Sequence, residues 1–298
     1  MKKSVSLLLA GLMLCGALAG CGGNSTESTE STGDAAQTET TGTSGAIHVV
    51  SREDGSGTRG AFVELTGVED DNGDNTTVDA EIANRTDAVL TTVAGNEAAI
   101  GYISLGSLNN TVKAVKVDGV EATVDNVKNG TYTLARPFNI ATKGEPTGVA
   151  ADFINFIMSA DGQAIVTEEG YITINDNAEA FTSDGSSGQI AVGGSSSVSP
   201  VMEKLIEAYQ AANPKAKIEL QTSDSTSGMT GAMDGTFAIG MASRELKDEE
   251  AAELTSQAIA MDGIAVIVNT ANTVEDLTMD QIRGIYVGEI TDWADVAA

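Results

Sequence analysis

The chain has 298 residues, of which 16 are basic and 43 are acidic, and its formal net charge is −27 at pH 7. A protein with so much negative charge repels nucleic acid, so we do not expect nucleic acid as a partner. The chain contains two cysteines and one histidine. A disulfide framework, a Ser-His-Asp relay or a His-rich metal site is therefore hard to build, and no cofactor and no metal are expected.

Residues 1–20 are typical of an export signal, because Lys2 and Lys3 precede an apolar run that is too short to span a bilayer. The small residues before Cys21 are similar to the lipid-attachment signal of bacterial lipoproteins, which predicts that Cys21 is acylated, for example with palmitate. The protein is then extracytoplasmic and lipid-anchored to the cell membrane. The alternative is an ordinary signal peptide that is cleaved elsewhere and leaves Cys21 as a lone thiol.

Residues 21–45 form the next segment, and after Cys21 it contains no large apolar side chain. Such a composition cannot bury a core, so we predict a flexible tether. The roughly 250 residues that follow are enough for two lobes with cores of their own.

Two stretches of the remaining chain share one pattern. "AIHVV" (46–50) is strand-like and leads through a Gly-Ser-Gly-Thr turn into a helix pattern, and "AIGYIS" (99–104) follows. "QIAVGGSSSVSPVMEKLIEAY" (189–209) again runs from strand through a Ser-rich turn into a helix, and "AIGMAS" (238–243) follows. This alternation predicts an α/β protein with largely parallel sheets.

The segment "DDNGDNTTVDAE" (70–81) partly matches the spacing of a calcium-binding loop, but Asn75 stands where such a loop requires Gly. We therefore predict an acidic surface loop here and no metal site.

Three turns of small residues each precede a predicted helix. They offer hydroxyl groups and unpaired backbone N–H groups, and the helix dipole adds partial positive charge where an anion would lie. Arg52 can add a bidentate, charge-assisted contact, and Asp54 can hold its guanidinium in place. We therefore predict one shared oxyanion site. The turns are Gly55-Ser56-Gly57-Thr58, Gly194-Ser195-Ser196-Ser197 and Ser225-Thr226-Ser227-Gly228.

Signatures of catalysis are missing from the sequence, which has neither G-x-x-x-x-G-K-[ST] nor G-x-S-x-G. The single histidine, His48, falls in a predicted strand. We therefore expect a binding protein and no enzyme, with a surface interaction protein or a phosphate-ester hydrolase as the alternatives from other classes.

Nearly all of residues 46–298 resembles the substrate-binding lipoproteins of bacterial ABC-type phosphate importers. In that family the Ser-rich block comes first and "ITDW" continues into "VVSREDGSGTR", whereas "TDWADVAA" ends this chain. The chain therefore looks circularly permuted, with "NDNAEAFTSDGSSG" (175–188) joining what would be the two termini. The blocks that carry the resemblance are "VVSREDGSGTRGAF", "IGYISLGSL", "FIMSADGQAIV", "GGSSSVSPVMEKL", "GMASREL", "DGIAVIVN" and "LTMDQIRGIYVGEITDW".

The resemblance implies a two-lobed α/β fold of the periplasmic-binding-protein type (type II), in which each lobe is a mainly parallel sheet flanked by helices. Two crossing strands near 136–143 and 259–268 would form the hinge. Residues 46–138 plus 264–298 would form the lobe with Arg52 and the GSGT turn, and residues 139–263 would form a continuous second lobe with the GGSSS and STSG turns.

The function implied by the resemblance is capture of inorganic phosphate in a cleft between the lobes. The protein would act as a monomer and deliver phosphate to an ABC-type permease and its ATPase in the membrane, without covalent chemistry. A receptor for another oxyanion, such as sulfate or molybdate, is the alternative within binding proteins.

The resemblance also assigns individual residues. Asp54 would orient Arg52. Some members of the family carry an Asp at the position of Ser243, where it accepts the proton of phosphate, and Asp262 is our candidate for that role here. The alternative for Asp262 is a hydrogen bond to the local backbone at the start of a strand. The implied phosphate contacts are Arg52, Ser56, Gly57, Thr58, Ser196, the Ser197 backbone, Ser227 and Ser243.

Overall fold

The structure is a computed structural model that describes residues 43–296. The predicted export signal, Cys21 and nearly all of the predicted tether lie outside these residues. No helix in the described part of the chain is long and apolar enough to cross a membrane.

The prediction of an α/β protein is confirmed. One nine-stranded sheet has the strand order β10-β9-β11-β8-β12-β5-β1-β4, with β6 also paired to β12. Within it, β1 is parallel to β4 and β5, and β9 is parallel to β10 and β11. Two large clusters of buried apolar side chains pack against the two ends of this sheet, and we call them the first and second core regions.

The first core region comes from both ends of the described chain. Phe62 and Tyr102 stack in it with ring centroids 3.9 Å apart, and Trp293 is fully buried. Its elements are β1 (His48–Arg52), α1 (Gly57–Thr66), β2 (Glu69–Asp70), β3 (Gly73–Asp74), β4 (Glu81–Ala83), α2 (Thr86–Gly95), β5 (Ala99–Ser104), η1 (Leu105–Ser107), β6 (Val112–Ala114), β7 (Lys116–Val117), α3 (Val124–Lys128), β13 (Asp276–Leu277), α9 (Met279–Tyr286) and α10 (Trp293–Val296).

The second core region is built from the middle of the chain. Phe153, Phe156 and Tyr209 form an aromatic group in it. Its elements are α4 (Val149–Met158), α5 (Ala160–Glu168), β9 (Gly188–Ser195), α6 (Ser199–Ala212), β10 (Ala216–Ser223), α7 (Ser225–Asp234), β11 (Ile239–Ala242) and α8 (Asp248–Ala251).

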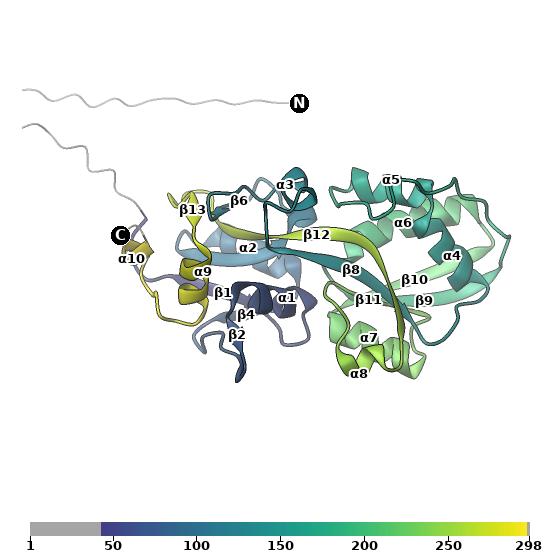
Figure 1. The fold of residues 1–298 in the computed structure, drawn as a ribbon, viewed down its shortest axis with the longest axis horizontal. Helices are drawn as coiled ribbons and strands as arrows, with labels where there is room; N and C mark the ends of the chain where they lie inside the picture. Colours follow the sequence, from purple (N-terminus) through teal and green to yellow (C-terminus); the bar gives the residue numbers. More distant parts are fainter. Residues whose placement is uncertain (1–42, 297–298) are drawn as a thin grey trace, which may run out of the picture. The chain divides into compact units, whose positions relative to one another are not determined.

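Two strands connect the core regions, β8 (Ala135–Thr142) and β12 (Thr255–Asn269) (Figure 1). Residues 255–263 of β12 pair antiparallel with β8, and residues 264–268 pair antiparallel with β5. Most of β8 is buried, and so is most of β12 from Ile259 onward, whereas Thr255, Ser256 and Gln257 at the start of β12 are exposed. The apolar run 264–268 lies in the buried part of β12, because a strand covered on both faces has no polar side.

The segment predicted to be an acidic surface loop (70–81) contains a short hairpin of β2 and β3, followed by the first residue of β4. Asp74 accepts a hydrogen bond from Nε of Arg59 over 2.7 Å. This carboxylate therefore fixes the segment to α1.

Asp152 of α4 fastens the segment 175–188 to the second core region. Its side chain is buried and accepts hydrogen bonds from Ser183 Oγ (2.7 Å), Asp184 N (3.0 Å), Tyr209 Oη (2.9 Å) and Asn213 Nδ2 (3.3 Å). Burial alone would raise the pKa of Asp152, but these hydrogen bonds together lower it below its ordinary value.

We expect Asp152→Asn to lower the free energy of unfolding at pH 7 by about 2 kcal/mol, because an ionised acceptor with several donors is lost. A carboxyl group with a lowered pKa in the folded state stabilises the fold above its ordinary pKa of 3.8, and this contribution disappears as the pH falls through the lowered value. Urea unfolding at pH 7 and in acid measures both effects.

The control for this variant is Asp161→Asn, because Asp161 is exposed and holds only the backbone N–H of Phe181. We expect a smaller loss there. An equal loss for Asp152→Asn at pH 7 and in acid would contradict a role for the ionised carboxylate.

Candidate functional site

The three predicted turns lie at the carboxyl ends of parallel strands. β1 ends at Arg52 before α1, β9 ends at Ser195 before α6, and β10 ends at Ser223 before α7. Because β9 and β10 run in the opposite direction to β1 in the sheet, the starts of α6 and α7 face the start of α1.

Arg52 is the buried cation of this region, with 2% of its surface exposed. Its Nη2 donates to Ser196 Oγ of the second core region over 3.1 Å. Nε and Nη2 also donate to the two carboxylate oxygens of Glu53, each over 2.8 Å. The backbone N–H of Arg52 donates to Tyr102 Oη over 3.1 Å, so the first core region fixes the end of β1.

Buried hydroxyl groups surround Arg52 and join the two core regions. Thr58 Oγ1 and Ser197 Oγ share a hydrogen bond of 2.8 Å, although they lie 139 residues apart in the sequence. Ser195 Oγ donates to Ser243 Oγ over 2.9 Å, and the N–H of Ser243 donates to Ser225 Oγ over 3.1 Å. We call the following residues the polar cluster: Arg52, Thr58, Thr86, Ser195, Ser196, Ser197, Ser225 and Ser243.

Gly57 allows the start of α1 to approach this cluster. A Cβ atom on Gly57 would lie 2.3 Å from Ser225 Oγ and 2.9 Å from Ser243 Oγ. Any larger residue would therefore push the two core regions apart. The preceding residue, Ser56, caps α1 through its Oγ, which accepts from the N–H of Arg59 over 3.3 Å.

Three members of the cluster were not among the individual contacts predicted from the sequence: Thr86 lies outside the predicted turns, and Ser195 and Ser225 lie within them. Ser227, which the sequence assigned to the site, is exposed and donates from its N–H and its Oγ to the carboxylate of Asp224. Asp224 is the N-cap of α7, so Ser225 begins the helix and faces the cluster. Asp is a preferred N-cap residue, so Asp224 before the Ser-Thr-Ser run was the sequence signal that α7 begins at Ser225.

In this structure Asp54, which the sequence assigned to orienting Arg52, contacts Arg59 instead. Asp54 is exposed and accepts from Arg59 Nη1 over 2.7 Å, and the same Nη1 donates to the backbone oxygen of Arg52 over 2.9 Å. Glu53 takes the expected role. The sequence argument overlooked that Arg59, in the first turn of α1, competes for Asp54.

Asp262 is fully buried on β12, but its contacts do not favour a role as acceptor of an anion's proton. Its Oδ1 accepts from Ser104 Oγ over 2.9 Å and its Oδ2 from Arg136 Nη2 over 3.1 Å. Burial raises the pKa of Asp262, and Arg136 and Ser104 act in the opposite direction. Both oxygens are thus engaged by partners outside the polar cluster.

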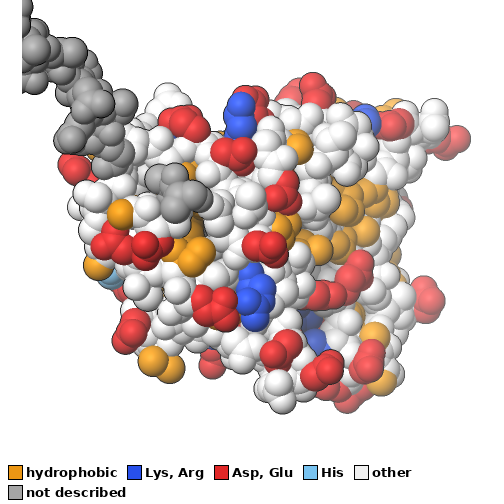
Figure 2. All heavy atoms as spheres, turned by 60° about the vertical axis from the view of Figure 1, so that its left-hand side comes forward, with side chains coloured by type: hydrophobic (Ala, Val, Ile, Leu, Met, Phe, Trp, Pro, Cys, Tyr) orange, Lys and Arg blue, Asp and Glu red, His pale blue; other side chains and the backbone are white. Residues whose placement is uncertain are grey.

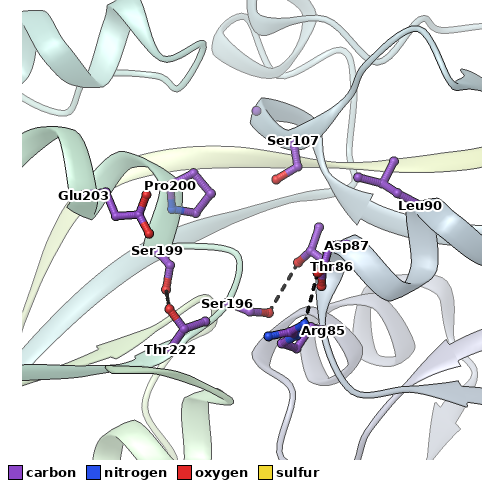
Figure 3. A pocket seen from close by; sticks show the side chains of 11 residues that line it. Arg85, Thr86, Asp87, Leu90, Ser107, Ser196, Ser199, Pro200, Glu203 and Thr222 are labelled. Carbon is purple, nitrogen blue, oxygen red and sulfur yellow. Dashed lines mark hydrogen bonds and ion pairs between the residues drawn. The ribbon is translucent and has the colours of Figure 1, made fainter. Parts of the chain in front are cut away.

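A cavity of about 410 Å³ opens beside the cluster. Thr86 and Ser196, whose hydroxyl oxygens are 3.4 Å apart, both line it, and Ser107 lines it as well (Figure 3). A second cavity, of about 420 Å³, reaches Ser56 and is lined by Arg59 and Arg244 among others. Residues of both core regions line each cavity, but only the first cavity is lined by members of the cluster, Thr86 and Ser196.

The chain as a whole is strongly acidic, with a net charge of −27. The face in Figure 2 carries many scattered Asp and Glu side chains and few Lys or Arg side chains. An anion bound here must therefore be held by short-range hydrogen bonds and by Arg52, not by the field of the whole protein. A buried guanidinium, several hydroxyls and a helix start are groups that bind a tetrahedral oxyanion.

Metal and acid-base groups are not gathered at the site. Among residues 43–296, no group of three or more His, Cys, Asp or Glu side chains is placed to hold a metal ion. His48 shares a hydrogen bond of 2.8 Å with Glu81 at the start of β1, at the opposite end of the strand from Arg52.

Comparisons with known proteins identify the family of this chain. The profile of the PBP superfamily domain matches residues 30–161 and 179–298. The phosphate-binding protein PstS 2 of Streptococcus agalactiae is 48% identical over 303 residues, which cover 99% of this chain and 98% of that protein. The phosphate-binding protein PstS of Bacillus subtilis is 37% identical over 134 residues, or 44% of this chain and 42% of that protein.

Among solved structures, the phosphate-binding protein of a phosphate ABC transporter from Streptococcus pneumoniae matches with a TM-score of 0.70 and 46% identity. The match covers 85% of this chain and all of that chain. The chain therefore belongs to the PBP superfamily and, within it, to the family of PstS phosphate-binding proteins.

Proposed function

We propose that this protein captures inorganic phosphate at the polar cluster and delivers it to an ABC-type phosphate permease with its ATPase in the membrane. The observation that carries the proposal is the contact of buried Arg52 with Ser196, which places a full positive charge where the two core regions meet. The names of the PstS relatives support phosphate as the ligand.

The two core regions would act as lobes that close on the ligand. We propose the boundaries 46–138 plus 264–298 for the first lobe and 139–263 for the second. Support comes from the separate apolar clusters and from β8 and β12, which run between them. Two crossing strands are a suitable hinge, because small changes in their backbone angles rotate whole lobes.

Phosphate would be held by donors from both lobes. Arg52 supplies charge-assisted hydrogen bonds, while Glu53 fixes the plane of its guanidinium. The hydroxyls of Thr58, Ser196 and Ser225 and the free N–H groups at the start of α1 complete the shell. We include Gly57, Ser56, Ser197 and Ser243 as backbone or hydroxyl contacts, and we replace Ser227 with Ser225.

Binding without turnover fits these residues best. Among the described residues the single histidine is engaged by Glu81, and the carboxylate that contacts Arg52 is held by two hydrogen bonds. A hydrolase would need a group free to move a proton to the leaving oxygen.

We expect the full protein to bind phosphate saturably in calorimetry and to bind sulfate and molybdate more weakly. Arg52→Ala should weaken phosphate binding by several kcal/mol, because the anion loses its buried counter-charge. Arg283→Ala is the control, since Arg283 is exposed and lies on α9. Parent-like binding by Arg52→Ala would refute the site, and no binding by the parent would refute the function.

A second pair of variants tests which serine of the third turn belongs to the site. Ser225→Ala should weaken phosphate binding by about 1 to 2 kcal/mol, because one buried hydroxyl is lost. Ser227→Ala should leave the dissociation constant unchanged, since its hydroxyl is exposed and bound to Asp224. If Ser227→Ala weakened phosphate binding more than Ser225→Ala did, the assignment of Ser227 made from the sequence would be correct.

We also propose that the chain is circularly permuted relative to other PstS proteins. The B. subtilis protein matches less than half of either sequence, as expected when a collinear alignment can follow only one of two exchanged halves. The S. agalactiae protein matches from end to end and so shares the order found here. In this arrangement residues 175–188 are the joint, and Asp152 secures it.

We propose that the protein is an extracytoplasmic, monomeric lipoprotein anchored through Cys21, on the evidence of the sequence pattern alone. Labelled palmitate should be incorporated into the parent and into Cys15→Ser, but not into Cys21→Ser, which should leave the membrane fraction. Label in Cys21→Ser would show that this cysteine is not the lipidated residue.

A further inference from the structure

The acidic segment 70–81 reaches the polar cluster through two consecutive hydrogen bonds. Arg59 of α1 donates from Nε to Asp74 Oδ2 over 2.7 Å. The same guanidinium donates from Nη1 to the backbone oxygen of Arg52 over 2.9 Å. Arg59 therefore connects this segment to the residue that carries the positive charge of the cluster.

Arg59 occupies an unusual position for a cation. It lies in the first turn of α1, where the helix dipole adds partial positive charge and disfavours a basic side chain. Only 14% of its side chain is exposed, and it pairs with two carboxylates, those of Asp54 and Asp74, each over 2.7 Å. The stability of α1 does not account for this position, whereas the bond to the backbone of Arg52 does.

Of the two carboxylates, Asp74 is the firmer anchor. The side chain of Asp54 is 97% exposed and that of Asp74 is 27% exposed, and exposed ion pairs contribute little. Asp74 Oδ1 also accepts from the backbone N–H of Thr76 over 2.8 Å and from its Oγ1 over 2.6 Å. Burial alone would raise the pKa of Asp74, but the bonds from Thr76 and Arg59 together lower it below its ordinary value. Asp74 is thus ionised at neutral pH.

The backbone that carries Asp74 is itself fixed to the first core region. The N–H of Thr77 donates to the backbone oxygen of Tyr286 over 2.8 Å. Tyr286 belongs to α9 and is fully buried, and its Oη donates to the backbone oxygen of Val50 on β1 over 3.3 Å. Asp74 therefore holds Arg59 from a position that the core determines.

Arg52 is held on both sides of its backbone. Its N–H donates to Tyr102 Oη over 3.1 Å, and its carbonyl oxygen accepts from Arg59. These two bonds fix the direction in which the side chain leaves the end of β1. Hydrogen bonds weaken steeply with poor geometry, so a small rotation of this backbone would impair the contacts that the guanidinium makes with an anion.

We propose that Asp74 and Arg59 are positioning residues for the polar cluster. Asp74 holds Arg59, and Arg59 holds the backbone of Arg52 so that its guanidinium meets the anion in the right direction. In this arrangement neither residue touches the ligand. The proposal rests on the proposed function, because phosphate is the anion concerned.

Charge alone predicts the opposite effect for Asp74. A carboxylate near an anion site repels the anion, so its removal would tighten binding if only electrostatics acted. Loss of positioning instead weakens binding. The sign of the change therefore separates the two explanations.

The test is Asp74→Asn in the full protein, which keeps the size of the side chain and removes its charge. The Asn can still accept from Thr76 but no longer pairs with the guanidinium of Arg59. We expect phosphate to bind roughly fivefold more weakly in calorimetry, a change typical of a residue that acts through others. Tighter or unchanged binding would overturn the proposal.

The matched control is Asp70→Asn, which removes the same charge from the same hairpin. Asp70 is exposed and accepts from the backbone N–H of Asn72 over 2.7 Å. We expect this variant to bind phosphate as the parent does or slightly more tightly. Equal weakening in both variants would indicate a general disturbance of the hairpin and contradict the positioning role.

A second measurement needs no ligand. The NMR signal of the Nε–H group of Arg52 reports the surroundings of its guanidinium, and Asp74→Asn and Arg59→Gln should both shift it, whereas Asp70→Asn should not. An unmoved signal in both variants would refute the positioning role. A parent protein that fails to bind phosphate would refute the proposed function, and this signal would still decide whether Asp74 and Arg59 position Arg52.

Discussion

The site depends on the burial of one guanidinium in a protein of net charge −27. Taking Arg52 out of water is costly unless its donors are occupied. Glu53 binds two of them, Ser196 shares one, and Tyr102 holds the backbone N–H, so the end of β1 has little freedom. Ser196 lies in the turn before α6 of the second core region. Its hydrogen bond to Arg52 therefore fixes how closely that region approaches the first.

The two core regions approach each other closely because the backbone at Gly57 meets short serine side chains, with no long side chain between them. Gly57 leaves only enough room for the hydroxyls of Ser225 and Ser243, so the start of α1 meets the turn before α7 directly. Short hydroxyl side chains then satisfy one another across the boundary, as Thr58 and Ser197 do. Such hydroxyls both donate and accept, which lets the same groups pair together without a ligand and turn to a tetrahedral anion when one is present.

The turns and Arg52 were predictable because their signals are local: a strand, a run of Gly, Ser and Thr, then a helix. The errors arose where a side chain's direction or partner depends on structure beyond that window. Ser225 and Ser227 differ by about half a turn of α7, so a helix start misplaced by two residues exchanges them. Asp262 looked available because its partner Arg136 lies 126 residues earlier in the sequence. The sequence alone does not show which residues of two neighbouring strands lie opposite each other, so it gave no sign of this ion pair.

The guanidinium groups around the site each have a carboxylate partner in this structure, and this affects how easily a receptor can release its ligand. An unpaired buried arginine would hold phosphate very tightly, since nothing else would satisfy its donors. Because a carboxylate already binds each guanidinium, phosphate has to compete with that carboxylate for the guanidinium N–H groups. In the proposed site its binding energy would come from many hydroxyl and N–H contacts that form only when the lobes meet, so separating the lobes would remove most of them together. The pairs are Arg52 with Glu53, Arg59 with Asp54 and Asp74, Arg136 with Asp262, and Arg244 with Glu250.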